Sequence, residues 1–354
     1  MGNLLAFEHG GNIYKIKRKY SEEVIDFSAN INPLGPPLKV KKTIKENIDR
    51  VLHYPDPESY DVAQKIAQYW GIEKDSILIG NGSVELIYLV IHAFKPKMVT
   101  IPIPTFSEYE RAARIAGAKI QHVKLNEDEN FTLTLSEVKG GDITFICNPN
   151  NPTGNLILEG SEELYKLPAK IIVVDEAFMD FLSDERNHTL IWKAQKDERI
   201  IVLRTFTKFF AIPGLRIGYL VAHPEIVRTL KQYQIPWSVN TLAQLSATSA
   251  LTESRYIENT RSFIEKQRRF LMGEISKIDG LFPYLSVANF ILIRIVDKGI
   301  TSPYLTEKLI QKGILIRDCS NFRGLNEGFI RIAIRSHEEN IKLIDSLKEV
   351  LWKI

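Results

Sequence analysis

Apolar residues along the chain change their spacing in a regular way between about residue 60 and residue 222. Stretches in which apolar positions recur three and four residues apart predict helices. Between them lie short runs of Val, Ile and Leu with little polar alternation, which are typical of strands covered on both faces. The predicted helices are 61–70, 83–94 and 106–116, and the predicted strands are 98–101, 119–125, 143–147, 171–174, 200–203 and 217–221. This order predicts an α/β fold with a mostly parallel sheet between layers of helices.

The pattern changes after Pro236, where longer charged segments replace the short apolar runs. Helices are predicted over 240–279, 303–312 and 337–351, and strands over 289–295, 313–317 and 329–334. Strands and helices in that order are typical of a smaller α+β domain.

The first 45 residues contain Pro33, Pro36 and Pro37. Because proline interrupts regular hydrogen bonding, this segment is interpreted as an extended arm and not as a core element. We expect three parts: an arm with part of the small domain in 1–45, a large domain in 46–236, and long helices with the small domain in 237–354.

The 354-residue chain has 44% hydrophobic and 25% charged residues, which is the usual composition of a globular protein. Its 46 Lys and Arg against 43 Asp and Glu leave a net charge of +3, so neither a nucleic acid nor a membrane is expected as a partner. Cys147 and Cys319 are too few for a disulfide framework or a cysteine-based zinc site, and we expect no metal. The N-terminal residues lack a signal-peptide pattern, so a cytoplasmic location is expected.

The segment 204–219 carries the strongest chemical signal. Lys208 follows a very apolar predicted strand, and a lysine that is buried near other cations loses its proton more easily, as Schiff-base chemistry requires. Thr205, Thr207 and Arg216 are the donors that a phosphate would need beside this lysine. The alternative is a surface loop with a chance lysine and arginine.

Polar residues also follow other predicted elements. Asp175 ends a buried strand, where it is suited to keep a pyridine nitrogen protonated, although it is equally suited to cap a helix. The turn 148–154 offers side-chain amides, although alone it is an ordinary turn. Gly82, Ser83 and Val84 open an apolar helix whose first N–H groups can bind a phosphate or be capped.

Together these four segments resemble the fold-type I pyridoxal-phosphate enzymes, in the branch that contains histidinol-phosphate aminotransferases. The resemblance implies a large, mostly parallel α/β/α domain that binds pyridoxal 5'-phosphate, and a smaller α+β domain. It also implies a Schiff base at Lys208, Asp175 on the pyridine nitrogen, Asn151 near the ring hydroxyl and Phe106 stacked on the ring. Tyr54 would reach the cofactor phosphate of the neighbouring subunit, which implies a homodimer.

Five further segments, 9–12, 27–35, 236–240, 314–319 and 331–336, resemble the L-threonine-O-3-phosphate decarboxylases of cobalamin synthesis. This resemblance implies substrate contacts at His9, Gly10, Asn30, Asn151, Arg317 and Arg331.

The residues themselves support a small, doubly anionic substrate. Arg317 and Arg331 lie on two predicted strands, and each guanidinium can bind a carboxylate or a phosphate through two N–H groups. Structural ion pairs are the alternative for both, and Arg335 is suited to one. Aminotransferases of the branch usually carry Tyr where this chain has Phe178, which cannot donate a hydrogen bond. This difference favours decarboxylation.

The expected reaction converts L-threonine O-3-phosphate into (R)-1-aminopropan-2-yl phosphate and CO₂. The arginines and His9 would hold the bond to the carboxylate perpendicular to the cofactor ring, and Lys208 or a water would return a proton to Cα. One alternative is an aminotransferase for histidinol phosphate that uses 2-oxoglutarate. Another is a pyridoxal-phosphate-binding regulatory module. Such modules are fused to a DNA-binding domain, for which we expect no room before the arm or after residue 351.

Overall fold

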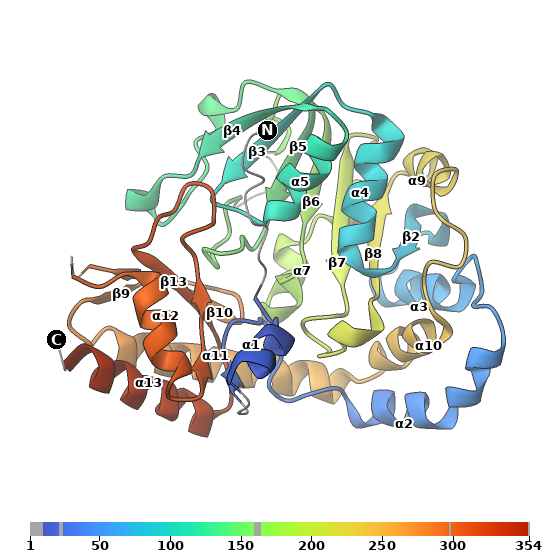
Figure 1. The fold of residues 1–354 in the computed structure, drawn as a ribbon. Coiled ribbons are helices and arrows are strands. Elements are labelled where there is room, and N and C mark those ends of the chain that lie inside the picture. Colours follow the sequence, from blue (N-terminus) through green and yellow to red (C-terminus); the bar gives the residue numbers. More distant parts are fainter. Residues whose placement is uncertain (1–9, 21–23, 159–163, 297–298, 353–354) are drawn as a thin grey trace.

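The computed structural model describes residues 10–20, 24–158, 164–296 and 299–352. A large seven-stranded sheet and a smaller four-stranded sheet organise them, and a third sheet has two strands. Figure 1 shows the smaller sheet with α12 and α13, in orange and red, to one side of a large central sheet. No helix in these four ranges is long and apolar enough to cross a membrane.

The large sheet has seven strands. In spatial order they are β2 (Ile77–Gly80), β8 (Gly218–Ala222), β7 (Ile200–Thr205), β6 (Ala169–Asp175), β5 (Gly141–Cys147), β3 (Met98–Ile103) and β4 (Lys119–Lys124). All neighbouring pairs are parallel except the two that involve β8. β8 reverses because residues 206–217 contain only a short 3₁₀ turn, whereas a parallel crossover needs about a dozen residues or more and usually a helix.

Helices cover both faces of this sheet, as the apolar strands predict. On β7, Ile201 and Leu203 face one core, and Ile200 and Val202 face the other. The first core includes residues of α4 (Gly82–Phe94), α5 (Ser107–Ile115) and α9 (Pro224–Lys231). The second includes residues of α3 (Tyr60–Trp70), α8 (Ile191–Ala194), α10 (Thr241–Ala250) and α11 (Ser254–Ile275). The short α7 (Glu185–His188) precedes α8.

The smaller sheet is antiparallel, in the order β12 (Arg317–Asp318), β13 (Phe329–Ala333), β10 (Phe290–Ile295) and β9 (Leu281–Pro283). α11, α12 (Ser302–Ile310) and α13 (His337–Trp352) complete this part of the fold. The predicted strand 313–317 is two strands. β11 (Ile314–Leu315) pairs with β1 (Ile25–Asp26) and β12 pairs with β13, because the N-terminal segment supplies a second partner.

The N-terminal segment differs from the extended arm predicted outside the core. It contains α1 (Ile13–Tyr20) and α2 (Leu38–Glu46), and Phe27 and Val40 are fully buried. Pro37 stands at the N-cap of α2, where proline is tolerated because the first helical N–H groups have no partner in the helix. α2 packs against α10, and this contact buries Val40.

The helices and strands predicted between residues 61 and 222 are all present, and none of their ends differs by more than two residues. β2, α9 and β9 are additional to the sequence prediction. The short 3₁₀ helices are η1 (Ile48–Leu52), η2 (Lys74–Ser76), η3 (Glu127–Glu129), η4 (Leu135–Glu137), η5 (Met179–Phe181) and η6 (Pro213–Leu215).

Candidate active site

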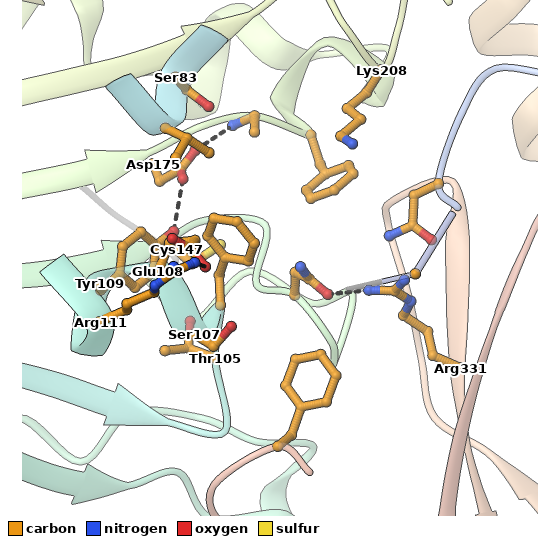
Figure 2. A pocket seen from close by; sticks show the side chains of 18 of the residues that line it. Ser83, Thr105, Ser107, Glu108, Tyr109, Arg111, Cys147, Asp175, Lys208 and Arg331 are labelled. Atoms are coloured by element: carbon orange, nitrogen blue, oxygen red, sulfur yellow. Dashed lines mark hydrogen bonds and ion pairs between the residues drawn. The ribbon is translucent and has the colours of Figure 1, made fainter. Parts of the chain in front are cut away.

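A pocket of about 460 Å³ lies between the large sheet and the small domain, within the usual size range of small-molecule sites. Thirteen of the residues singled out from the sequence line it: Gly10, Asn30, Ser83, Val84, Phe106, Asn151, Asp175, Thr205, Thr207, Lys208, Arg216, Arg317 and Arg331. They come from segments far apart in the chain, which meet because parallel strands bring the loops after their carboxyl ends to one edge of the sheet. Figure 2 shows Lys208, Asp175 and Arg331 around the same space.

Lys208 lies in the turn between β7 and β8, and its backbone carbonyl accepts a hydrogen bond from the backbone N–H of Asn32 at 3.1 Å. Burial lowers the pKa of Lys208 to about 8, and nearby Arg331 and Arg216 act in the same direction. Asp175 opposes this shift in the pKa. A larger fraction of this lysine is therefore the reactive neutral amine near physiological pH than in an exposed lysine.

Asp175 ends β6 and is buried. Its carboxylate accepts a hydrogen bond from the Tyr109 hydroxyl at 2.7 Å and one from the backbone N–H of Ala177 at 3.0 Å. Burial raises the pKa of Asp175, whereas these hydrogen bonds and the charge of Lys208 lower it by a smaller amount. A cation placed against this carboxylate would offset the cost of burying it.

Tyr109 is a site residue that the sequence analysis missed. It is fully buried and its ring stacks on Phe145, with ring centroids 4.8 Å apart. Its position on the predicted helix 106–116, three residues after Phe106, is the signal that was available, since a phenol buried on an apolar helix face needs a partner for its hydroxyl.

The Asn-Pro turn after β5 is built by Asn150. Its side-chain nitrogen donates to the Pro104 carbonyl at 2.9 Å and to the Thr153 hydroxyl at 2.8 Å, and its oxygen accepts from the Thr105 hydroxyl at 2.8 Å. The neighbouring Asn151 lines the pocket, and its side-chain oxygen accepts a hydrogen bond from Arg331.

The N-terminus of α4 forms a cradle with Arg216. Gly82 has a φ of +79°, and a Cβ there would lie 2.4 Å from Arg216 Nη2, so glycine is required for the guanidinium to cross the start of the helix. Thr205 and Thr207 join the pocket from β7 and the turn after it, with their hydroxyl oxygens 2.9 Å apart. Helix N–H groups, hydroxyls and a guanidinium together make an anion site.

Arg317 and Arg331 are cross-strand partners in the pairing of β12 with β13. Like charges in this position are destabilising unless an anion lies between them. Arg331 is buried and donates to the Ser28 carbonyl at 2.7 Å, and among the described residues no acceptor lies within hydrogen-bond range of its Nε. Burial lowers the pKa of Arg331 to about 10. Cys319 raises this pKa, and the charge of Arg317 lowers it further.

Arg331 donates hydrogen bonds to neutral groups of Asn151 and Ser28, whereas Arg335 pairs with Glu339 at 3.0 Å. The ion-pair alternative therefore describes Arg335, whereas the buried Nε of Arg331 has no acceptor among the described residues. Asn30 is also buried, and its side-chain oxygen has no partner within the part of the chain that the structure describes.

Among the described residues singled out from the sequence, Gly82 and Tyr54 do not line the pocket. His9 lies outside the described residues. Gly82 lies behind the guanidinium of Arg216 at the start of α4. Tyr54 is 82% exposed and its ring packs against Trp237, with centroids 5.0 Å apart. Within the described ranges, no group of three or more His, Cys, Asp or Glu side chains is arranged to hold a metal ion.

The loop after β12 brings residues to the pocket that the sequence analysis did not single out, namely Asn321, Phe322 and Arg323. Phe178 lines the pocket as well, and its ring packs edge-on against Phe290 with centroids 4.9 Å apart. The polar loop 318–328 between two predicted strands was the available signal for the first three.

Comparison with known proteins identifies one family, but the similar proteins within it are named for two different reactions. A family model described as aminotransferase class I and II matches residues 22–347. The threonine-phosphate decarboxylase of Salmonella typhimurium is 36% identical, covering 98% of this chain and 97% of its own length. The histidinol-phosphate aminotransferase of Thermoanaerobacter pseudethanolicus is 38% identical, covering 91% and 92%. The crystal structure of L-threonine-O-3-phosphate decarboxylase from Porphyromonas gingivalis matches with a TM-score of 0.82 at 27% identity, covering 92% and 99%.

Proposed function

Because the chain belongs to the family of class I and II aminotransferases, we propose that it is a pyridoxal-phosphate-dependent decarboxylase of L-threonine O-3-phosphate. Its products are (R)-1-aminopropan-2-yl phosphate, a precursor of the cobalamin side chain, and CO₂. The fold is that of the fold-type I enzymes, with a large α/β/α domain around the seven-stranded sheet and a smaller α+β domain around the four-stranded sheet. Since the two relatives match to a similar degree but differ in reaction, the proposal rests on the pocket and not on overall identity.

Pyridoxal 5'-phosphate is the cofactor of this family, and the pocket residues fit it. The cradle at the start of α4, where the absence of a side chain at Gly82 leaves room for the guanidinium of Arg216, suits its phosphate. The lowered pKa of Lys208 suits covalent attachment of its aldehyde, and buried Asp175 suits a protonated ring nitrogen. When bound, the cofactor supplies an electron sink for the bond that breaks at the substrate Cα.

We assign the holding roles as follows. Lys208 attaches the cofactor, and Asp175 keeps the proton on its ring nitrogen. With the cofactor bound, Asn151 would face the ring hydroxyl and Phe106 would stack on the ring. The phosphate is held by the N–H groups of α4 and by hydroxyl and guanidinium donors, namely Gly82, Ser83, Val84, Thr205, Thr207 and Arg216.

One observation carries the choice of substrate: Arg317 and Arg331 are cross-strand partners at the pocket, and the Nε donor of Arg331 is unused. L-Threonine O-3-phosphate carries two anionic groups, a carboxylate and a phosphate, whereas histidinol phosphate carries only the phosphate. Two adjacent guanidinium groups match the doubly anionic molecule. His9, Gly10, Asn30 and Asn151 complete the proposed substrate contacts.

The same contacts select the bond that breaks. By holding the carboxylate and the phosphate, Arg317 and Arg331 keep the substrate in one orientation, with the bond from Cα to the carboxylate carbon perpendicular to the ring. That bond breaks, CO₂ leaves, and a proton from Lys208 Nζ or from a water is added to Cα. Phe178 lines this region and adds no hydrogen-bond donor, which supports decarboxylation over transamination.

A homodimer is part of the proposal. Apolar side chains of α2, η1 and the segments 54–60 and 235–237 are at least half exposed in the single chain. They are Leu38, Ile48, Val51, Leu52, Tyr54, Tyr60, Ile235 and Trp237. Large exposed apolar surfaces mark interfaces. We assign this surface to a second copy, with Tyr54 reaching the cofactor phosphate of the neighbouring subunit, and we place the dimer in the cytoplasm.

The deciding experiment supplies L-threonine O-3-phosphate without any keto acid. Release of CO₂ at a rate that saturates with substrate is expected. The rival function is a histidinol-phosphate aminotransferase, which the relative from Thermoanaerobacter pseudethanolicus favours. Turnover of histidinol phosphate that depends on 2-oxoglutarate, with no CO₂ released from phosphothreonine, would replace the proposal with this rival.

A further inference from the structure

The loop between β12 and β13 extends from the small domain toward the large one (Figure 1). Residues 319–325 of this loop, here called the strap, supply Asn321, Phe322 and Arg323 to the pocket lining. Backbone hydrogen bonds from Phe322 N–H to the Cys319 carbonyl and from Leu325 N–H to the Phe322 carbonyl, both 3.0 Å, keep the strap in a compact turn.

Arg323 fastens the strap to the large domain. Its Nε donates to Glu110 Oε2 at 2.9 Å and its Nη2 donates to Glu110 Oε1 at 3.1 Å, so the guanidinium binds the carboxylate through two parallel hydrogen bonds. Glu110 is buried on α5, whose N-cap residue is Phe106. The ion pair therefore joins the strap to the helix that follows the aromatic residue assigned to the cofactor ring.

A close backbone approach supports the same contact. Gly324 has a φ of +92°, and a Cβ there would lie 3.3 Å from the backbone nitrogen of Pro104 and 3.5 Å from the carbonyl carbon of Ile103. The strap thus lies against the end of β3, beside the turn that leads into α5.

The other side of the strap holds Arg317. Arg317 Nη2 donates to the side-chain oxygen of Asn321 at 2.8 Å, and its guanidinium lies 5.1 Å from the centroid of the Phe322 ring. A hydrogen bond and an aromatic face restrict a side chain that otherwise has considerable rotamer freedom. Arg317 is thereby directed by the strap.

Glu110 is well suited as an anchor. Burial alone would raise its pKa, but hydrogen bonds from His122, Arg323 and Arg114 lower the pKa of Glu110 to about 2. The carboxylate remains ionised at any pH used for an assay. Its contacts with Arg114 and His122 fix its position on the large domain.

We propose that the Arg323–Glu110 ion pair fixes the strap across the pocket and, through Asn321 and Phe322, positions Arg317 to bind an anionic group of the substrate. Arg323 and Glu110 are positioning residues in this proposal. It rests on the proposed function only for the identity of that substrate.

A second ion pair between the two domains provides a matched control. Arg294 on β10 lies 2.9 Å from Glu127 of η3, and neither residue lines the pocket. Loss of this pair tests whether any contact between the small and large domains has the same effect.

The experiment measures steady-state kinetics of Arg323→Gln, Glu110→Gln and the double variant with L-threonine O-3-phosphate. Each variant is expected to raise KM about tenfold with kcat within about twofold, and the double variant to resemble the single ones, because the residues act as one unit. Arg323→Lys should recover part of the loss, and Arg294→Gln should leave KM within about twofold.

Two measurements use the cofactor-free enzyme. Amide hydrogen exchange of residues 319–325 should accelerate about tenfold in Arg323→Gln, whereas the affinity for pyridoxal phosphate should not change. An unchanged KM in Arg323→Gln, or an equal rise in Arg294→Gln, overturns the proposal. If the wild type releases no CO₂, the proposed function fails and not the role of the strap. The variants are then assayed with histidinol phosphate and 2-oxoglutarate as substrates. The same pattern of KM values in that assay still supports the role of the strap.

Discussion

Arg204 and Glu176 form a fully buried ion pair, with Arg204 Nε 2.8 Å from Glu176 Oε2. Each residue adjoins a pocket residue in the chain, since Asp175 precedes Glu176 and Thr205 follows Arg204. Arg204 Nη1 also lies 3.2 Å from a carboxylate oxygen of Glu185. The network joins the ends of β6 and β7 directly beneath the site.

Removing one member of this pair should destabilise the fold. Glu176→Gln leaves the buried guanidinium of Arg204 paired only with Asp180 and Glu185, and the loss of one buried hydrogen-bond partner costs about 1–3 kcal/mol. Urea unfolding of the cofactor-free protein measures the change. Glu225→Gln, which breaks an exposed pair with Arg228, is the control and should cost less than about 1 kcal/mol. Equal losses in the two variants would show that the buried network adds no particular stability.

Lys208→Ala should abolish turnover and the absorption band of the lysine-bound cofactor, because no other group can take over covalent attachment. The rate is expected to fall by at least about 10³-fold. Absorption spectra and CO₂ release report the two effects. Lys231→Ala, on the exposed side of α9, should leave both unchanged. Full activity in Lys208→Ala would refute the assignment of the site.

Attachment of pyridoxal phosphate to the cofactor-free enzyme should depend on the protonation of Lys208. The pKa of Lys208 is lowered to about 8 by burial, Arg331 and Arg216, so the amine is protonated below this pH and neutral above it. The attachment rate should therefore rise toward pH 8 and level off above it, instead of rising toward the usual lysine pKa of about 10.4. Stopped-flow absorbance measures the profile.

Arg331→Met should move the midpoint of that profile to higher pH, because it removes a cation that lowers the pKa of Lys208. A midpoint that stays in place, or moves to lower pH, would contradict this explanation of the pKa of Lys208.

Arg317→Met and Arg331→Met should each lower kcat/KM for L-threonine O-3-phosphate by about 10- to 10³-fold, the range expected when a charge-assisted contact to the substrate is lost. Arg335→Met is the matched control, since Arg335 already pairs with Glu339, and should change kcat/KM less than about threefold. If Arg335→Met were as damaging as the other two, the arginines would act on folding and not on substrate binding.

Mixing two inactive variants tests the role of Tyr54. In a heterodimer of Tyr54→Ala and Lys208→Ala chains, one site has both an intact Lys208 and an intact Tyr54 from the neighbouring chain. Random mixing should restore about a quarter of the wild-type activity, because about half of the dimers are mixed and each has one complete site. No recovery after verified exchange of subunits would place Tyr54 outside the neighbouring site.

The pattern of apolar residues was sufficient for most of the central sheet. The runs around Val173 and Val202 predicted buried strands, and both are covered on two faces. The same reasoning failed for the N-terminal segment, which contains α2 and buried Phe27. The prolines before α2 led to the prediction of an extended segment. Proline is tolerated at the start of a helix and disrupts only its interior, and the sequence pattern did not show which position these prolines take.

The sequence alone determined the residue types of the site and their order along the chain, since local spacing placed Lys208 and Asp175 at strand ends. Only the tertiary structure decided which residues meet. The contact of Tyr109 with Asp175, the pairing of Arg317 with Arg331 and the ion pair of Arg323 with Glu110 join positions 66, 14 and 213 residues apart. Contacts between segments depend on strand order and domain packing, which no local pattern specifies.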